Sequence, residues 1–217
     1  MELLRASFEI RTKVNGSEIL ADIESAGRTC YKSEKNISEV SSKEFVKRLI
    51  DSKHESVLEH RSLSVRFVCD RGVSHEMVRH RLASFSQEST RYVNYGKRGH
   101  SFIIPCWFKG NDYASIYREI GGPTWLGVLE QSETDYNFLV GECGWTPQQA
   151  RTILPNSTKT EIVVTANLRE WRTILYQRCA YAAHPQMREL MIPLLKELRS
   201  LIPVIFDDIE YDRSFCS

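Results

Sequence analysis

The chain has 217 residues, of which 41% are hydrophobic, and it carries 29 Lys and Arg against 28 Asp and Glu, a formal net charge of +1. This length suffices for one substantial core, and no Pro/Gly/Ser-rich linker interrupts it, so we expect a single domain over residues 1–217. The balanced charge argues against a general nucleic-acid binder, and apolar runs shorter than about 18 residues argue against a membrane span.

The N-terminal sequence lacks the apolar core and the small-residue cleavage site of a signal peptide, which predicts a cytoplasmic protein. Six cysteines are present without a C-x-x-C pair among them. This pattern argues against a zinc site and indicates free thiols in a reducing compartment. We therefore expect no bound metal.

A strand and a short helix are predicted at the N-terminus. Residues 2–10 alternate loosely between apolar and polar side chains and predict the strand. Asn15-Gly16 predicts a turn after it. Apolar residues over 19–26 recur at helical spacing, and Gly27 is expected to end this helix.

An amphipathic helix and a His-Glu segment come next. Ser41 or Ser42 is expected to cap the helix, whose buried face is formed by Phe45, Val46, Leu49 and Ile50. In the segment HESVLEH, His54 and His60 are six positions apart, whereas zinc proteases need His-Glu-x-x-His to place both imidazoles on one helical face. The spacing excludes that metal site, and a lone His is ordinarily a surface or structural residue. Residues 61–69 then alternate and predict a half-buried strand.

Residues 75–95, HEMVRHRLASFSQESTRYVNY, concentrate arginines on a framework with regular apolar spacing. Ser74 is expected to cap a helix along which apolar residues recur at Met77, Leu82 and Phe85. If the chain is extended after Gln87, Ser89 and Arg91 lie on one face. Guanidinium groups bond oxyanions bidentately, so the cluster favours a planar or phosphorylated anion. The alternative is a solvated helix face with modest ion pairs.

The C-terminal half is predicted to hold several helices and one strand. The break at residues 121–123, Gly-Gly-Pro, precedes a long helix whose apolar stripe is core or an oligomer contact. Residues 146–149, TPQQ, predict a short capped helix. Residues 158–165 alternate as a strand, and Asn167 is expected to cap the next helix. In the last helix, apolar residues recur at helical spacing and predict a face that is buried in the core. These residues are Met187, Leu190, Met191, Leu194, Leu195 and Leu198.

The order of residues in the arginine stretch resembles the Arg-His-Arg-x7-Ser signature of the flavin-dependent thymidylate synthases. Residues 79–81, Arg-His-Arg, are followed after seven residues by Ser89, with Arg91 two positions further. Ser86 departs from the family pattern, in which Asn is frequent at this position. Further segments resemble the family in the same order, namely His54–His60, Asn167–Arg172 and Arg178–Arg188.

The resemblance implies an α+β fold, a mixed sheet with packed helices, in a homotetramer whose active sites are shared between subunits. It implies the reductive methylation of dUMP to dTMP, with 5,10-methylenetetrahydrofolate as one-carbon donor and NADPH as reductant through FAD. In this family reduced flavin delivers hydride and no enzyme nucleophile is required. The implied partners are therefore dUMP, folate and further copies of the chain, without a nucleic-acid polymer or a membrane.

The resemblance also assigns roles to residues. It implies that Arg178 and His54 are catalytic, with Arg178 at the uracil ring. The residues implied to bind dUMP are Arg79, Gln87, Ser89, Arg91, Arg151 and Arg178. Those implied to bind FAD are Cys30, Ser56, Glu59, Arg79, His80, Arg81, Asn167, Arg169 and His184. The rival hypothesis is a non-catalytic nucleotide- or RNA-binding module that uses the same arginine cluster.

Overall fold

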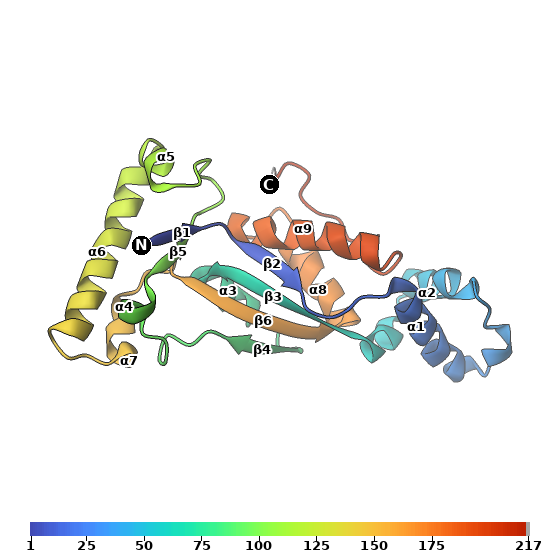
Figure 1. The fold of residues 1–217 in the computed structure, drawn as a ribbon. Coiled ribbons are helices and arrows are strands. Elements are labelled where there is room, and N and C mark those ends of the chain that lie inside the picture. Colours follow the sequence, from blue (N-terminus) through green and yellow to red (C-terminus); the bar gives the residue numbers. More distant parts are fainter. Residues whose placement is uncertain (216–217) are drawn as a thin grey trace. The chain divides into compact units, whose positions relative to one another are not determined.

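The computed structural model describes residues 1–215 and has an α+β fold of strands and helices (Figure 1). One sheet has four strands in the order β2-β3-β6-β4, and a second pairs β1 with β5. The residues fall into two compact units. Unit 1 holds residues 1–7, 67–79 and 86–163, and unit 2 holds residues 8–66, 80–85 and those from Val164 onward.

Unit 1 is built around a parallel strand pair and five helices. β1 (Glu2–Leu4) and β5 (Ser101–Ile103) pair with Leu3 opposite Phe102. The helices are α3 (Arg71–Met77), α4 (Tyr95–Arg98), α5 (Tyr113–Tyr117), α6 (Gly122–Gly141) and α7 (Pro147–Ala150), and the 3-10 turn η3 (Arg151–Ile153) follows α7. Buried side chains from β5 to α6 form one apolar cluster, namely Ile104, Phe108, Ile116 and Leu126.

Unit 2 contains the remaining helices. They are α1 (Gly16–Tyr31), α2 (Ser41–Asp51), α8 (Leu168–Arg178) and α9 (Pro185–Leu201), with the 3-10 turns η1 (Glu34–Asn36) and η2 (Glu55–His60). The strands of the four-stranded sheet, β2 (Ser7–Ile10), β3 (Ser62–Asp70), β4 (Ala83–Gln87) and β6 (Lys159–Asn167), each contribute residues to both units. The six apolar positions predicted for the last helix are all buried on α9.

Several elements confirm what the residue pattern predicts. Leu63, Val65 and Phe67 of β3 are each at most 1% exposed, so the alternating strand buries one face. The four apolar residues of α2 are buried as well. Asn167 caps α8, because its side chain accepts from the Glu170 backbone at 2.8 Å. The capping box at the start of α7 also forms, with Gln149 Oε1 accepting from the Thr146 backbone at 2.9 Å.

The N-terminal predictions are partly wrong. The expected single strand over residues 2–10 is two strands that belong to different sheets. Asn15 does not form a free turn, because its side chain accepts from the Glu18 backbone at 3.2 Å and caps α1. Gly27 does not end this helix, which continues to Tyr31 and terminates at Lys32 in the left-handed region. Gly27 instead lies where a Cβ would be 2.7 Å from the Phe45 ring, so its missing side chain allows α1 to approach α2.

The helix expected to start at Ser74 begins earlier and is shorter. Asp70 Oδ1 accepts from the Val73 backbone at 2.7 Å, so Asp70 caps α3. The helix ends at Met77, Leu82 is 77% exposed, and Phe85 lies on β4. The segment after Gln87 is a turn rather than extended chain, because the backbone of Val93 donates to the Ser89 carbonyl at 3.0 Å. The predicted sharing of one face by Ser89 and Arg91 is therefore wrong.

The thiol prediction is confirmed at four cysteines: Cys30, Cys69, Cys143 and Cys179 are free. Cys216 lies outside the described residues. Within residues 1–215, no helix combines the length and apolar character needed to cross a lipid bilayer.

Candidate functional site

A partly buried hydrogen bond joins the arginine stretch to the end of α8 within unit 2. Arg178 Nε donates to His80 Nε2 at 2.9 Å, and His80 is 7% exposed. Because a guanidinium can only donate, His80 Nε2 acts as the acceptor and the imidazole is neutral, with its proton on Nδ1. Burial, and then the positive charge of Arg178, lower the pKa of His80 to about 4. The neutral ring is thus stable across the physiological pH range.

Glu170 lies on the other side of the His80 ring. Its Oε1 is 3.8 Å from His80 Nδ1, and burial raises the pKa of this carboxyl group. Since the imidazole is neutral, this contact orients a dipole rather than forming an ion pair. Glu170 and Arg178 are on one helix, so α8 approaches His80 with an acceptor near its start and a donor at its end.

The position of α8 is fixed by the strand that it covers. Trp171 is fully buried, and its indole Nε1 donates to the Leu63 carbonyl of β3 at 3.0 Å. The Asn167 cap starts the helix directly at the end of β6. These contacts are local or lie within unit 2, and they place Arg178 in the last turn beside His80.

A cavity of about 470 Å³ opens at the start of α8 and is lined by Glu59, Leu82, Asn167, Arg169, Glu170 and Thr173. Three of the nine residues predicted to bind FAD are therefore together here. Arg169 Nη1 donates to Glu59 Oε1 at 2.6 Å across the cavity wall, and both side chains are about half exposed. The lining combines one cation, two carboxylates and an exposed apolar side chain.

Other residues predicted for the flavin side are in unit 2 but outside this lining. His54 and Ser56 are exposed on either side of Glu55, at the start of η2. Cys30 is exposed in the last turn of α1. His184 caps α9, where its Nδ1 accepts from the Gln186 backbone at 3.3 Å.

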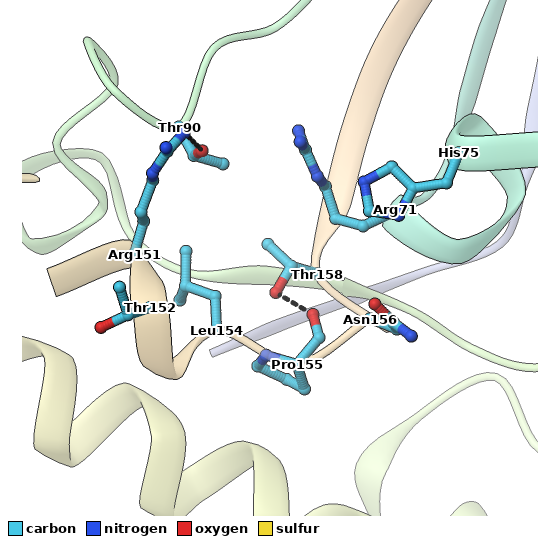
Figure 2. A pocket seen from close by; sticks show the side chains of 9 residues that line it. All are labelled: Arg71, His75, Thr90, Arg151, Thr152, Leu154, Pro155, Asn156 and Thr158. Carbon is cyan, nitrogen blue, oxygen red and sulfur yellow. Dashed lines mark hydrogen bonds between the residues drawn. The ribbon is translucent and has the colours of Figure 1, made fainter. Parts of the chain in front are cut away.

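Unit 1 contains a cationic pocket of about 220 Å³ (Figure 2). It is lined by Arg71, His75, Thr90, Arg151, Thr152, Leu154, Pro155, Asn156 and Thr158. Two guanidinium groups from different segments, Arg71 of α3 and Arg151 of η3, flank this pocket. The nine described lining residues include no carboxylate, so the pocket suits an anion.

Hydroxyl and carbonyl groups orient the two guanidinium groups. Arg151 Nη1 donates to Thr90 Oγ1 at 3.4 Å, and Arg71 Nη1 donates to the Glu88 carbonyl at 3.4 Å and to Thr160 Oγ1 at 3.5 Å. These long hydrogen bonds to neutral acceptors leave the positive charges uncompensated by the lining. The sequence does not predict Arg71 and His75 as pocket residues, because a pocket formed by α3 and the 151–158 segment has no local sequence signature.

The other predicted nucleotide residues of unit 1 do not line the pocket. Gln87 Nε2 donates to Ser74 Oγ at 2.8 Å and to Thr160 Oγ1 at 3.2 Å, so its amide is engaged within the unit. Arg91 Nε donates to Gln148 Oε1 at 3.1 Å, and the Arg91 backbone donates to Ser89 Oγ at 3.3 Å. Thr90, between the two predicted residues, reaches the pocket instead.

The Arg-His-Arg triplet follows α3 in a turn. Arg79 and Arg81 are exposed, whereas His80 between them is buried. Arg79 belongs to unit 1, and His80 and Arg81 belong to unit 2. Within residues 1–215, no group of three or more His, Cys, Asp and Glu side chains is arranged to hold a metal ion.

Comparisons with a family model, with curated proteins and with solved structures each find proteins that are similar to this chain. A family model described as thymidylate synthase complementing protein matches residues 14–204. Among curated proteins, the flavin-dependent thymidylate synthase of Mycobacterium tuberculosis is 33% identical over 198 residues, which cover 87% of this chain and 78% of the relative. The enzyme of the same name from Corynebacterium aurimucosum is 34% identical over 209 residues, which cover 88% and 80%.

Two solved structures share the fold. A UMP/dUMP methylase from Streptomyces cacaoi, bound with 5-Br dUMP, matches with a TM-score of 0.77 at 20% identity, covering 95% of this chain and 96% of that one. A flavin-dependent thymidylate synthase from Helicobacter pylori, complexed with FAD and dUMP, matches with a TM-score of 0.73 at 21% identity, covering 95% and 99%.

Proposed function

Since the chain belongs to the flavin-dependent thymidylate synthase family, we propose that it converts dUMP to dTMP with 5,10-methylenetetrahydrofolate as one-carbon donor and NADPH as reductant through FAD. The family match over residues 14–204 includes residues of both units, which supports a single catalytic domain over residues 1–217. The observation that carries the proposal is the hydrogen bond between Arg178 and His80, because it joins two residues that the family resemblance selects independently.

Arg178 is proposed to act on the uracil ring. Methylation requires negative charge to build up in the pyrimidine when C5 attacks the one-carbon unit. A guanidinium oriented before the reaction stabilises such charge without reorganisation during the step. The bond from Nε to His80 fixes the guanidinium plane, and the neutral His80 adds no competing positive charge. His54, at the start of η2, is the second proposed catalytic residue.

The cationic pocket of unit 1 supports binding of the nucleotide phosphate. Arg151 is proposed to bind dUMP, and Arg71 supplies a second guanidinium in the same pocket. Two arginines without a facing carboxylate fit a phosphate monoester, which accepts bidentate hydrogen bonds. We propose that Ser89 and Arg91 contribute through the turn that follows β4, Gln87 from the end of β4, and Arg79 from its exposed position.

Ser89 is assigned to binding rather than to nucleophilic attack. Its Oγ accepts from the Arg91 backbone at 3.3 Å, which is a local turn contact. An activated serine needs an adjacent base that is itself oriented by a third group. The proposed chemistry also requires no enzyme nucleophile, so the turn contact suffices for a positioning role.

The cavity at the start of α8 fits parts of FAD. Arg169 offers a guanidinium for a diphosphate, Glu59 and Glu170 can accept from ribityl or ribose hydroxyl groups, and Leu82 offers an apolar surface. Asn167, already the helix cap, adds an amide at the cavity wall. Cys30, Ser56, His80, Arg81 and His184 are proposed to complete the flavin contacts. When bound, FAD would supply the hydride that reduces the transferred carbon.

A homotetramer with shared active sites remains part of the proposal. His54, Arg79, Arg81, Arg91 and Arg151 are exposed in the single chain, as expected for residues that gain ligands and neighbours on assembly. Val128 and Phe138 of α6 are 54% and 57% exposed, which supports contacts between copies. We further propose a cytoplasmic enzyme with dUMP and folate as its small-molecule partners and without a nucleic-acid polymer.

The test is spectroscopic and kinetic. Purified protein should show a flavin absorption spectrum, oxidise NADPH faster when dUMP is added, and form dTMP with methylenetetrahydrofolate. A colourless protein that binds no FAD on titration would overturn the proposal. Binding of nucleotides or RNA without dTMP formation would instead support the non-catalytic rival.

A further inference from the structure

A buried arginine of α8 contacts the segment that carries His54. Arg172 is 7% exposed. Its Nη1 and Nη2 donate to Asp208 Oδ1 and Oδ2 at 2.6 and 2.8 Å, and Nη1 also donates to the Ile205 carbonyl. Nη2 donates in addition to Glu55 Oε1 at 3.1 Å. One guanidinium therefore connects η2 with the segment that follows α9.

Glu55 is the first residue of η2 and lies between His54 and Ser56. On its N-terminal side, the His54 backbone donates to the Leu49 carbonyl of α2 at 2.8 Å. At the other end of η2, Glu59 accepts from Arg169, one helical turn from Arg172 on α8. The helix thus holds both ends of η2 through two carboxylates.

The two ion pairs differ in their surroundings. The Arg169 and Glu59 side chains are 50% and 45% exposed, so solvent screens this pair and its contribution is small. The Arg172 and Glu55 side chains are 8% and 20% exposed. Breaking a desolvated ion pair leaves a buried charge with fewer partners, which lowers the free energy of unfolding. The Glu55 end of η2 is therefore the more firmly held.

Asp208 completes the charge balance around the guanidinium. Its bidentate contact with Arg172 lowers the pKa of the Asp208 carboxyl group, so it stays ionised at neutral pH. With Asp208 fixing the guanidinium plane, the remaining donor direction of Nη2 points to Glu55. A lysine has a single charged nitrogen and lacks the planar fork that contacts both carboxylates in this geometry.

We propose that Arg172 is a positioning residue that acts through Glu55 to hold the His54–Glu59 segment in its active conformation. This inference rests on the proposed function, because it gives His54, Ser56 and Glu59 their roles at the active site. Arg172 and Glu55 need not touch substrate or flavin. Their effect on catalysis is transmitted by the backbone of η2.

The experiment compares truncation of the two carboxylates on the same guanidinium. Glu55→Ala should lower kcat for dTMP formation by about tenfold or more and accelerate amide hydrogen exchange over residues 52–61 by a similar factor. Asp208→Ala is the matched control, because it removes a carboxylate from the opposite side of Arg172. It should lower Tm, and it should lower kcat less than Glu55→Ala does, because the Arg172–Glu55 contact remains.

A second variant guards against loss of folding. Glu55→Gln keeps an oxygen acceptor for Arg172 and should give kcat and exchange rates between those of the wild type and Glu55→Ala. A purely structural role for Arg172 would lower Tm in both alanine variants and reduce kcat equally in both, which would overturn the inference.

The exchange measurement separates this inference from the proposed function. A wild-type protein that binds no FAD and forms no dTMP would overturn the proposed function, and with it the catalytic purpose of η2. Unchanged exchange over residues 52–61 in Glu55→Ala would overturn the positioning role of Arg172 whether or not the wild type binds flavin.

Discussion

Arg178 donates from Nε to His80 Nε2 at 2.9 Å, and this bond joins the end of α8 to the middle residue of the Arg-His-Arg triplet. The two residues are 98 positions apart in the chain. The contact explains why a histidine between two exposed arginines is itself buried. His80 provides a neutral acceptor for the guanidinium that we propose acts on the substrate.

Replacing Arg178 should separate catalysis from flavin binding. Arg178→Ala removes the donor proposed to stabilise negative charge in the pyrimidine, and the expected loss in kcat is about 10²- to 10³-fold. FAD should still bind, because the cavity at the start of α8 is lined by other residues. Rapid-quench measurement of dTMP and flavin titration test both parts. Arg11→Ala, at a half-exposed arginine paired with Glu9, is the control and should retain wild-type turnover.

The lowered pKa of His80 should make the free energy of unfolding decrease as the pH falls. Its pKa is lowered from 6.5 to about 4 in the folded protein, so the unfolded chain binds more protons between these values. The contribution of the neutral His80 is fully present above pH 6.5 and is lost as the pH falls toward 4, by at most about 3 kcal/mol.

The measurement is urea unfolding at pH 7.5, 6, 5 and 4.5 for the wild type and for His80→Gln. The glutamine retains an acceptor for Arg178 but does not titrate, so its free energy of unfolding should fall less steeply over this range. Carboxylates elsewhere contribute equally to both proteins and cancel in the comparison. Parallel pH profiles for the two proteins would show that His80 does not titrate as proposed.

The sequence predicts elements whose determinants are local. The alternation of Leu63, Val65 and Phe67 is a property of one strand, and the Asn167 cap needs only the Glu170 backbone three residues away. Both predictions are confirmed. The start of α3 is misplaced because Ser74 and Asp70 are both good caps, and the choice depends on where β3 ends.

The contacts among the site residues are harder to predict from the sequence than these local elements. Family resemblance selects His80 and Arg178, but their contact depends on how α8 packs on β3 through Trp171. Arg71 has no motif, and its part in the cationic pocket follows from the fold of the 151–158 segment beside it. Leu82 is predicted on one side of a helix with Met77 and Phe85, whereas the helix ends at Met77 and Leu82 is 77% exposed at the cavity of unit 2.

The cationic pocket should recognise the phosphate of dUMP. Arg71→Gln and Arg151→Gln each remove a charged donor, and loss of one charge-assisted hydrogen bond of about 1.5–3 kcal/mol corresponds to a roughly 10- to 100-fold rise in KM for dUMP. The value of kcat should change little, because the phosphate is remote from the reacting carbon.

Deoxyuridine, which lacks the phosphate, is the matched probe for this pocket. In competition binding, the wild type and both pocket variants should bind deoxyuridine with equal, weak affinity. If a variant weakened the binding of deoxyuridine as much as the binding of dUMP, the substituted arginine would contact the base or sugar, or the substitution would have caused a general structural defect.

Replacing Gly27 by alanine should destabilise the protein, whereas replacing Gly127 by alanine should stabilise it. At Gly27 in α1, a Cβ would be 2.7 Å from Phe45 Cε1 and 3.2 Å from a Leu49 methyl carbon, so Gly27→Ala forces α1 away from α2. Overpacking of this kind costs about 1–3 kcal/mol. At Gly127 in α6, a Cβ meets no described atom within 4 Å, and Gly127→Ala should stabilise the helix by about 0.5–1 kcal/mol. Urea unfolding gives both values. Equal stabilisation by the two substitutions would mean that α1 and α2 are not in close contact at Gly27.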